Sequence, residues 1–526
     1  MPLPKTRIPD YYQVIPAANA PELPHGRYQN YVVFLDDNGD PIDLVGGSSA
    51  SASLQSLQSQ YYGEFYKALR NGGKVTIKCR GDSLTYGQDT VSANKRAGIG
   101  DTMSNGDVRT TQRAAITYPE SLQTAMDEVY GTGKVTVKNE GFSGDNVDLN
   151  YLHFATNSKT TNVPCMTLIM LGINDAVGTW NTWYDRIDLF IAGYEKIITR
   201  ELNWGCGVIM LTPPKVRDQS TVIDGFANAL SALAAKYGIP LVDAEEFLAN
   251  HGVDYFSDGW HMNGKGYEIF GKKVAAMFIG EGGPAKPFVV TNGSRVLTRP
   301  TLDNVFYKGA VFGSNQYSYT PAEKVADQGI QAQMTTNGAV IYYSFYTETD
   351  DTVIYPVGYL GCDSVQAGNL SKLDFTLDFG VQQPDYSMDD ITGITSNYFT
   401  TKPPSTVPIA LLAGETFFQF GLTKATVAAN RHGSIHIARK GWHVLAVKFD
   451  KINTTSYGGL MGFEAVNYRL SQLIVPFVKD GLQQASYGTA RPTTPAAGYC
   501  HYDATLNKPI WWTGSQWKDA TGTVVT

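Results

Sequence analysis

The chain has 526 residues, with 42 Lys and Arg against 49 Asp and Glu, and a formal net charge of −7. This length exceeds what one hydrophobic core supports, so we expect roughly two to four domains. The charged fraction of 17% is typical of a globular protein, and the lack of a Lys/Arg cluster argues against a nucleic-acid partner.

The cysteines are odd in number and widely spaced, at Cys79, Cys165, Cys206, Cys362 and Cys500. No pair forms a C-x-x-C pattern, so we expect neither a disulfide framework nor a zinc site. The first residues lack the apolar core of a signal peptide, and no apolar run reaches the roughly 18 residues of a membrane span. We therefore expect a soluble protein that an ordinary signal peptide does not export.

Residues 1–55 are rich in Pro, Ala and Ser and are interpreted as an N-terminal attachment segment. Asn38-Gly39, between two apolar runs, predicts a hairpin turn. Asp36, Asn38 and Asp40 are spaced as in a calcium loop. Pro41 stands where an EF-hand loop needs glycine, which favours the turn.

Residues 56–285 alternate strand and helix patterns and are predicted to form one domain. Helical patterns in this region end at Gly131 and Gly238. The alternation predicts an α/β fold with a three-layer, doubly wound parallel sheet, which binds ligands beyond the carboxyl ends of its strands. Strands are expected at 74–79, where polar and apolar residues alternate as in a strand with one buried face, and at 134–138, 165–171, 207–212 and 239–243.

After a linker at 281–290, residues 291–455 contain short aromatic and β-branched runs with little helical period. This pattern predicts an antiparallel β-sandwich, for which we consider carbohydrate binding or subunit contacts. His432 and His436 would share one strand face and suggest a metal. No third ligand is near them in sequence, so a sandwich surface is favoured.

Residues 456–526 form a C-terminal tail segment that is rich in Thr, Gly and Trp and is expected to be short and β-rich. Its tryptophans could stack on sugars, but packing within the tail is the favoured interpretation for Trp511, Trp512 and Trp517.

Polar residues follow three of the predicted strands, and a later loop adds an Asp-x-x-His pattern. Ser83 follows the first strand, Gly144 the second and Asn174 the third, while Asp258 and His261 lie near the end of the region. Each stretch alone is an ordinary loop. Together they supply a serine nucleophile, a histidine base and an aspartate that orients the base. Backbone N–H groups of Ser83 and Gly144 and the Asn174 amide would form an oxyanion hole.

These stretches resemble the SGNH, or GDSL-type, serine hydrolases. Gly81-Asp82-Ser83-Leu84, Gly144, Gly172-Ile173-Asn174-Asp175 and Asp258-Gly259-Trp260-His261 match the family's four blocks in order, over about residues 70–275. The resemblance implies a flavodoxin-like sheet and an esterase with catalytic Ser83, Asp258 and His261. It implies no cofactor and no metal.

Two features depart from the family pattern. Trp260 stands where many members carry a smaller residue, so the entrance beside His261 is expected to differ. The long polar stretch 88–117 separates the first strand from its helix and is interpreted as a lid or a binding loop.

Thr85 replaces the second glycine of the Gly-x-Ser-x-Gly elbow of α/β-hydrolases, which favours a flatter and more open site.

Residues 487–523 resemble the C-terminal segments of bacteriophage tail fibres and tailspikes. The shared features are Thr-x-Arg-Pro, Gly-Tyr-x-x-Tyr-Asp-x-Thr-Leu-x-Lys-Pro-Ile and Trp-x-Asp-Ala-Thr-Gly. The resemblance implies a homotrimer in a virion tail, assembled in the host cytoplasm among other tail proteins and acting extracellularly, without a membrane partner.

The implied substrate is O-acetylated bacterial polysaccharide, either capsule or O-antigen, from which the esterase would remove acetyl groups. Two alternatives stay open at this point. One is a lipid or aryl esterase of the same family, and the other is a receptor-binding tail protein without catalysis.

Overall fold

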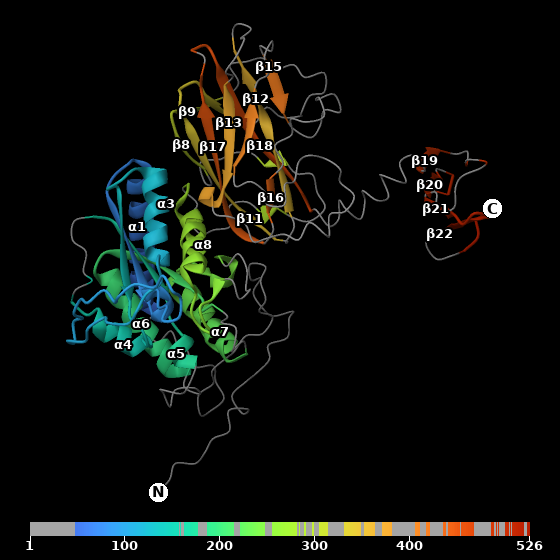
Figure 1. Ribbon diagram of the computed structural model, residues 1–526. Coiled ribbons are helices and arrows are strands. Elements are labelled where there is room, and N and C mark those ends of the chain that lie inside the picture. The colour runs from blue at the N-terminus through green and yellow to red at the C-terminus, as the bar shows by residue number, and fades with distance from the viewer. Residues whose placement is uncertain are drawn as a thin grey trace. The chain divides into compact units, whose positions relative to one another are not determined.

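The chain divides into two compact units, Met1–Ala285 and Lys286–Thr526, in the computed structural model drawn in Figure 1. The structure describes residues 48–156, 158, 163–176, 187–214, 221–247, 255–280, 283, 289–290, 297–298, 305–313, 331–348, 352–362, 371–380, 406–410, 417–420, 435–437, 440–452, 454–467, 485–488, 491, 493, 500–503, 505–506, 508–519 and 523–525. The predicted Asn38-Gly39 turn and His432 lie outside these ranges.

The first unit contains a five-stranded parallel sheet with the order β2-β1-β3-β4-β5. In this order β1 lies inside the sheet, with β2 on one side of it and β3, β4 and β5 added in sequence on the other, as in flavodoxin-like folds. The predicted parallel, doubly wound sheet is thereby confirmed. Its strands are β1 (Val75–Gly81), β2 (Val135–Gly141), β3 (Cys165–Met170), β4 (Cys206–Leu211) and β5 (Leu241–Val242).

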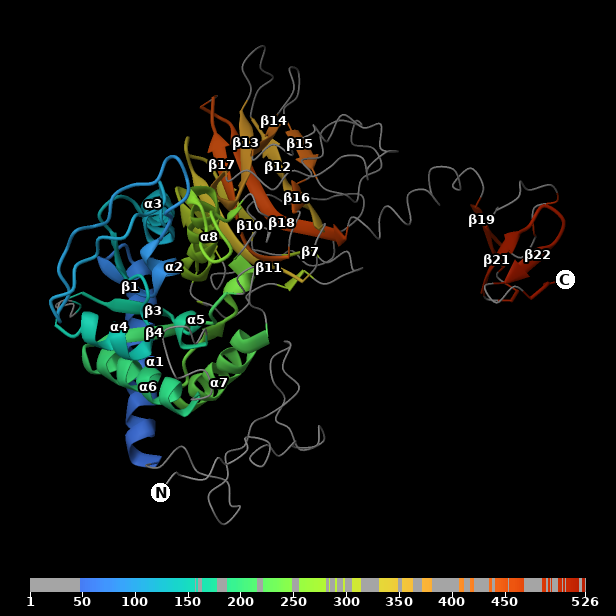
Figure 2. The same cartoon turned by 60° about the horizontal axis from the view of Figure 1, so that its bottom comes forward.

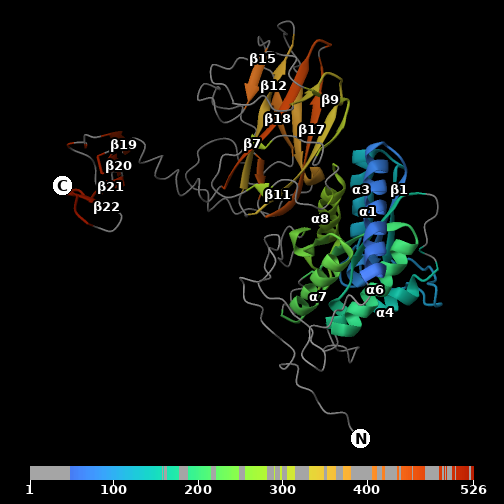
Figure 3. The ribbon, with the colours of Figure 1, turned by 180° about the vertical axis from the view of Figure 1, so that it is seen from behind.

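Helices cover both faces of this sheet, as Figures 2 and 3 show. One layer contains α3 (Tyr118–Tyr130) and α8 (Gly264–Val274), and the other contains α1 (Ser48–Arg70), α6 (Ile187–Asn203) and α7 (Thr221–Tyr237). Short elements at the carboxyl edge are α2 (Ser83–Tyr86), α4 (Val147–His153), α5 (Ile173–Ala176) and η3 (Ala244–Phe247), and η5 (Ala275–Phe278) follows α8.

Helix α1 corrects the predicted boundary between residues 55 and 56, because it begins at Ser48 and crosses that point. The Gln58 side chain pairs with the backbone of Val208 in β4, with both hydrogen bonds at 2.8 Å. Phe65 and Leu69 are buried, so the helix belongs to the same fold as the parallel sheet.

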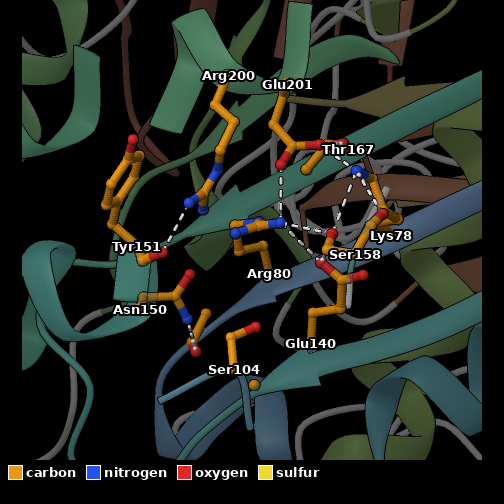
Figure 4. Close-up of polar contacts among 12 residues, drawn as sticks. Lys78, Arg80, Ser104, Glu140, Asn150, Tyr151, Ser158, Thr167, Arg200 and Glu201 are labelled. Carbon is orange, nitrogen blue, oxygen red and sulfur yellow. Dashed lines mark hydrogen bonds and ion pairs between the residues drawn. The ribbon is translucent and has the colours of Figure 1, made fainter. Parts of the chain in front are cut away.

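Strand β1 also corrects an expectation, because its alternation suggested one buried and one exposed face, whereas all seven residues are buried. Lys78 and Arg80 are compatible with burial because they pair with carboxylates, as Figure 4 shows. Arg80 Nη2 lies 3.0 Å from Glu140 Oε2 and 2.7 Å from Glu201 Oε1, and Lys78 also pairs with Glu201. Ser158 Oγ adds a hydrogen bond to Glu140.

The second unit contains two mainly antiparallel sheets, which confirms the predicted β-rich region. One has the path β15-β12-β18-β10-β9, with β16 and β7 paired off it, and the other has β14-β13-β17-β11-β6, with β8 paired off it. Their strands are β6 (Val289–Val290), β7 (Leu297–Thr298), β8 (Val305–Lys308), β9 (Ala310–Gly313), β10 (Gln331–Met334), β11 (Val340–Thr347), β12 (Thr352–Gly361), β13 (Lys372–Leu377), β14 (Thr406–Ala410), β15 (Phe417–Phe420), β16 (Ile435–Ile437), β17 (Gly441–Asp450) and β18 (Tyr457–Asn467).

Apolar residues of both sheets form one core, which includes Ile341, Leu373, Val447 and Leu460. Strand β18 lies beyond the predicted end of the sandwich at residue 455, yet it pairs with β12 along its length. The predicted boundary is too early because the glycines of β18 lower its apolar content, while its partner lies about a hundred residues earlier in the chain.

The tail forms a separate four-stranded sheet with the order β19-β20-β21-β22. Trp512 and Trp517 pack with ring centroids 5.4 Å apart, and Trp517 is buried, consistent with packing within the tail. The strands are β19 (Ala485–Gly488), β20 (Cys500–Asp503), β21 (Lys508–Trp512) and β22 (Trp517–Asp519).

Two features are absent from the described part of the chain. It contains no helix long and apolar enough to cross a membrane. It also contains no group of three His, Cys, Asp or Glu side chains placed to hold a metal ion.

Candidate active site

Ser83 stands at the point where β1 leaves the sheet. Asp82 caps the short helix α2 by accepting a hydrogen bond from Leu84 N at 2.9 Å, and Ser83 is the first residue of α2. A Cβ at Gly81 would lie 2.6 Å from Met170 O, so only glycine allows the strand to pass β3 here. The Gly-Asp-Ser sequence therefore ends the strand and starts the helix in one turn.

The loop before α8 brings His261 and Asp258 to this serine. His261 Nε2 lies 3.1 Å from Ser83 Oγ, although the two residues are 178 positions apart in the chain. On its other side, His261 Nδ1 lies 2.9 Å from Asp258 Oδ2. Because Asp258 accepts the Nδ1 proton, Nε2 is left as the acceptor that faces the serine hydroxyl.

Asp258 is fixed by its own backbone turn as well as by the histidine. Its Oδ1 accepts hydrogen bonds from the backbone N–H groups of Trp260 and His261, both at 2.7 Å. Partial burial favours a higher pKa for Asp258, but the hydrogen bonds from His261 and from the two N–H groups outweigh it and lower the pKa. Asp258 therefore stays ionised at neutral pH.

The three predicted oxyanion donors follow β1, β2 and β3. The N–H of Ser83 has no acceptor within its helix because Ser83 is the first helical residue. Gly144 has a φ of 88°, which favours glycine, and no atom lies within 4 Å of where a Cβ would stand. Asn174 Nδ2 donates to the backbone oxygen of Asp145 at 2.8 Å, which orients the amide while its second hydrogen stays available.

Three buried carboxyls surround this edge of the sheet. Burial, partly offset by hydrogen bonds, raises the pKa of Asp82 to about 7, that of Asp145 to about 6 and that of Asp175 to about 7. Asp145 and Asp175 further raise the pKa of Asp82. The edge that presents Ser83 therefore carries groups that gain charge near neutral pH.

The long stretch 88–117 is attached to the end of β2 and to the end of α4. Arg109 Nη1 donates to the backbone oxygens of Asn139 at 2.9 Å and Gly141 at 3.0 Å. Ser104 N donates to His153 O at 2.9 Å. The stretch therefore contacts the two elements, β2 and α4, between which the turn with Gly144 lies.

Sequence reasoning assigned no role to Asp145, Asn150 and His153, which form hydrogen bonds with one another next to the oxyanion donors. Asn150 Nδ2 donates to Gly81 O and to Asp145 Oδ2, both at 2.9 Å. Asp145 follows the matched Gly144 directly, which is the signal that could have drawn attention to it. Nothing in the sequence pattern indicated that His153 contacts it.

A pocket of about 410 Å³ lies between the long stretch and the start of α8, which begins three residues after His261 in the chain. Its lining is mainly polar and consists of Ser92, Asn94, Ala115, Ile116, Asn263, Gly264, Lys265 and Glu268. Amide, hydroxyl and charged groups of this kind bind hydroxyl-rich ligands more readily than hydrocarbon chains.

Several solved structures are similar to this chain. The tail fibre protein gp63.1 from a phage of E. coli is 14% identical, with a TM-score of 0.47, over 76% of this chain and 48% of that one. The chain thus spans about half the length of that tail fibre protein. The acetylxylan esterase Axe2 from Geobacillus stearothermophilus is 20% identical, with a TM-score of 0.28, over 38% of this chain and 91% of that one.

A third similar structure is CEX, a two-domain esterase active on acetylated mannans. It is 13% identical, with a TM-score of 0.28, over 76% of this chain and 93% of that one. No curated protein matches the sequence.

The family is assigned from a match of the sequence to a family model, and not from the solved structures. The model of the GDSL-like Lipase/Acylhydrolase family matches residues 79–269. The match begins in β1, ends in α8 and includes Ser83, Gly144, Asn174, Asp258 and His261. Residues 79–269 therefore form a GDSL-like lipase/acylhydrolase domain.

Proposed function

We propose that this chain is a serine esterase that removes O-acetyl groups from a bacterial surface polysaccharide, and that it acts as part of a phage tail. The observation that carries the proposal is the hydrogen-bonded series from Ser83 Oγ through His261 to Asp258, at 3.1 and 2.9 Å. These are the distances at which a histidine takes the proton of a serine nucleophile.

In the proposed reaction, Ser83 Oγ attacks the acetyl carbonyl carbon while His261 Nε2 takes the hydroxyl proton. The carbonyl oxygen becomes an oxyanion, which the N–H groups of Ser83 and Gly144 and the Asn174 amide stabilise. His261 then gives its proton to the departing sugar oxygen as the C–O bond breaks. A water molecule attacks the acetyl-Ser83 ester by the same route, and acetate leaves.

Two observations support a carbohydrate as the alcohol portion. The pocket between the long stretch and α8 is lined mainly by polar side chains, which suit sugar hydroxyls better than lipid chains. The sequence resemblance of residues 487–523 to phage tail proteins supports a substrate on the bacterial surface. The same resemblance supports a homotrimer that assembles with other tail proteins.

The experiment compares the wild type with Ser83→Ala on two substrates, p-nitrophenyl acetate and purified O-acetylated polysaccharide. We expect both activities to fall by orders of magnitude in a variant that unfolds at the wild-type temperature. A folded Ser83→Ala variant that keeps more than about a tenth of the activity would exclude Ser83 as the nucleophile.

The polysaccharide arm separates the substrate classes. Acetate release from the polysaccharide supports the proposed function. Hydrolysis of p-nitrophenyl acetate or acyl lipids without acetate release from any polysaccharide would favour a lipid or aryl esterase. Polysaccharide binding without hydrolysis of any ester would favour a receptor-binding protein.

A further inference from the structure

His153 is the last residue of α4 and lies between two carboxylates. Its Nδ1 is 2.7 Å from Asp145 Oδ1, and its Nε2 is 2.9 Å from Asp107 Oδ2. The histidine side chain is buried, whereas Asp107 keeps 57% of its side-chain surface exposed. Phe142 stacks on the imidazole with ring centroids 4.0 Å apart.

When Asp145 and Asp107 are both ionised, this geometry requires a charged imidazole. A neutral imidazole has one N–H donor, so it can serve only one ionised carboxylate. An imidazolium has two donors and serves both. Its position at the C-terminus of α4 also favours the positive charge.

The electrostatic environment acts in the same direction. Burial lowers the pKa of His153, but the hydrogen bonds and charges of Asp145 and Asp107 outweigh it and raise the pKa. Arg80 also lies near this site and lowers the pKa of Asp145, and the Arg109 guanidinium lies 5.8 Å from the ring of the adjacent Phe154. The buried carboxyls of Asp82 and Asp175 also face Asp145, and the charge of Asp145 raises the pKa of both.

The carboxylate that His153 holds belongs to the turn that forms the oxyanion hole. Asp145 follows Gly144, and its backbone oxygen accepts the hydrogen bond from Asn174 Nδ2. Its second carboxylate oxygen accepts from Asn150, which also binds Gly81 O, two residues before Ser83. Asp145 therefore links all three proposed oxyanion donors.

We infer that His153 is a positioning residue for the oxyanion hole, which it fixes through Asp145 while Asp107 ties the same ring to the long stretch 88–117. The inference rests on the proposed function. Loss of the second N–H donor would release one carboxylate and loosen the turn. The proposal therefore predicts that activity depends on the charge of a residue that does not contact the substrate.

The test measures kcat and KM of the full chain on p-nitrophenyl acetate between pH 6 and 10. The variants are His153→Gln, Asp107→Asn and, as a matched control, Asp148→Asn, which removes an exposed carboxylate of the same helix that lies 3.5 Å from Lys196. We expect His153→Gln to lower kcat about 10–100-fold with little change in KM, since oxyanion donors act mainly in the transition state. We expect Asp148→Asn to match the wild type.

The pH profile distinguishes positioning from a purely structural role. Because the imidazolium is lost as the pH rises through the raised pKa of His153, the wild type should lose kcat at alkaline pH, and His153→Gln should lack this decrease. Asp107 raises that pKa, so Asp107→Asn should move the decrease to lower pH. Asp107 is largely exposed, so this variant tests the proposal even where His153→Gln fails to fold.

The outcomes separate this inference from the proposed function. Wild-type kcat in His153→Gln, or an unmoved alkaline decrease in Asp107→Asn, overturns the positioning role and leaves the conclusion from Ser83→Ala unchanged. Activity that survives Ser83→Ala overturns the proposed function itself. A lowered kcat without an alkaline decrease in His153→Gln supports the inference. So does an alkaline decrease that Asp107→Asn moves to lower pH.

Discussion

Asp258→Asn tests the histidine–aspartate pair with the smallest change in shape. The wild-type carboxylate accepts two backbone N–H groups at 2.7 Å through Oδ1 and the imidazole Nδ1–H at 2.9 Å through Oδ2. The asparagine oxygen can keep the two backbone hydrogen bonds, which maintains the turn. Its NH₂ group then faces Nδ1, where it can donate but not accept.

The consequence is the wrong histidine tautomer. An NH₂ donor favours a bare Nδ1, so the ring proton moves to Nε2, which then faces Ser83 Oγ and cannot accept its proton. In a buried triad such an exchange costs about 10⁴ in kcat. The Asp258 side chain is 29% exposed, so water can compensate in part. We expect a loss of about 10²–10⁴, or roughly 2.7–5.5 kcal/mol in the activation barrier.

The assay is p-nitrophenyl acetate hydrolysis at pH 8, with thermal unfolding as the check on folding. Asp503→Asn is the matched control, because Asp503 Oδ1 also accepts two backbone N–H groups, at 2.9 and 3.0 Å, and its Oδ2 binds Arg491. The control should keep full activity. A folded Asp258→Asn enzyme within about threefold of the wild type would refute the tautomer argument.

Four further predictions address the donors, the buried charges and the assembly. Asn174→Ala should lower kcat about 10²–10³-fold at constant KM in steady-state kinetics; an effect on KM alone would contradict an oxyanion role. Burial raises the pKa of Asp175 from its ordinary value near 4 to about 7, so the ionised carboxylate destabilises the fold. The free energy of unfolding is unaffected below about pH 4 and falls as the pH rises from there to about 7. Asp175→Asn should therefore raise the unfolding free energy at pH 8, by at most about 4 kcal/mol, and denaturant titrations with no gain over the wild type would argue against this. Glu201→Gln removes the carboxylate that Lys78 and Arg80 share, so urea unfolding should show a free energy of unfolding lower by about 3–5 kcal/mol. An unchanged urea midpoint would show that the fold does not need these ion pairs. In light scattering the full chain should be a trimer and a fragment of residues 48–285 should not; a monomeric full chain would remove the argument from the tail resemblance.

The sheet and the four blocks could be read from the sequence because their signals are local. A run such as Cys165–Met170 is almost wholly apolar, and only the centre of a covered sheet accommodates it. Helix α1 was missed because Ser and Gln occupy much of its length and its apolar face becomes evident only against β4.

The charged interior could not be read locally. Lys78 and Arg80 alternate with apolar residues as they would on a half-exposed strand, and their partners Glu140 and Glu201 come from other elements far along the chain. His153 was missed for the same reason, because Asp107 lies 46 positions before it in the chain. Pairings of this kind are set by tertiary structure, which periodicity does not report.

The ion network beneath β1 also selects the register of that strand. Val75, Ile77 and Cys79 point to one face, and Thr76, Lys78 and Arg80 point to the other. A slip of one residue against β2 or β3 would exchange the faces and place two cations among apolar side chains, away from Glu140 and Glu201. Such misaligned pairings are therefore strongly disfavoured during folding. The paired charges therefore fix the register of β1 and the position of its carboxyl end. Because Ser83 follows that end directly, they also fix the position of Ser83 relative to the sheet.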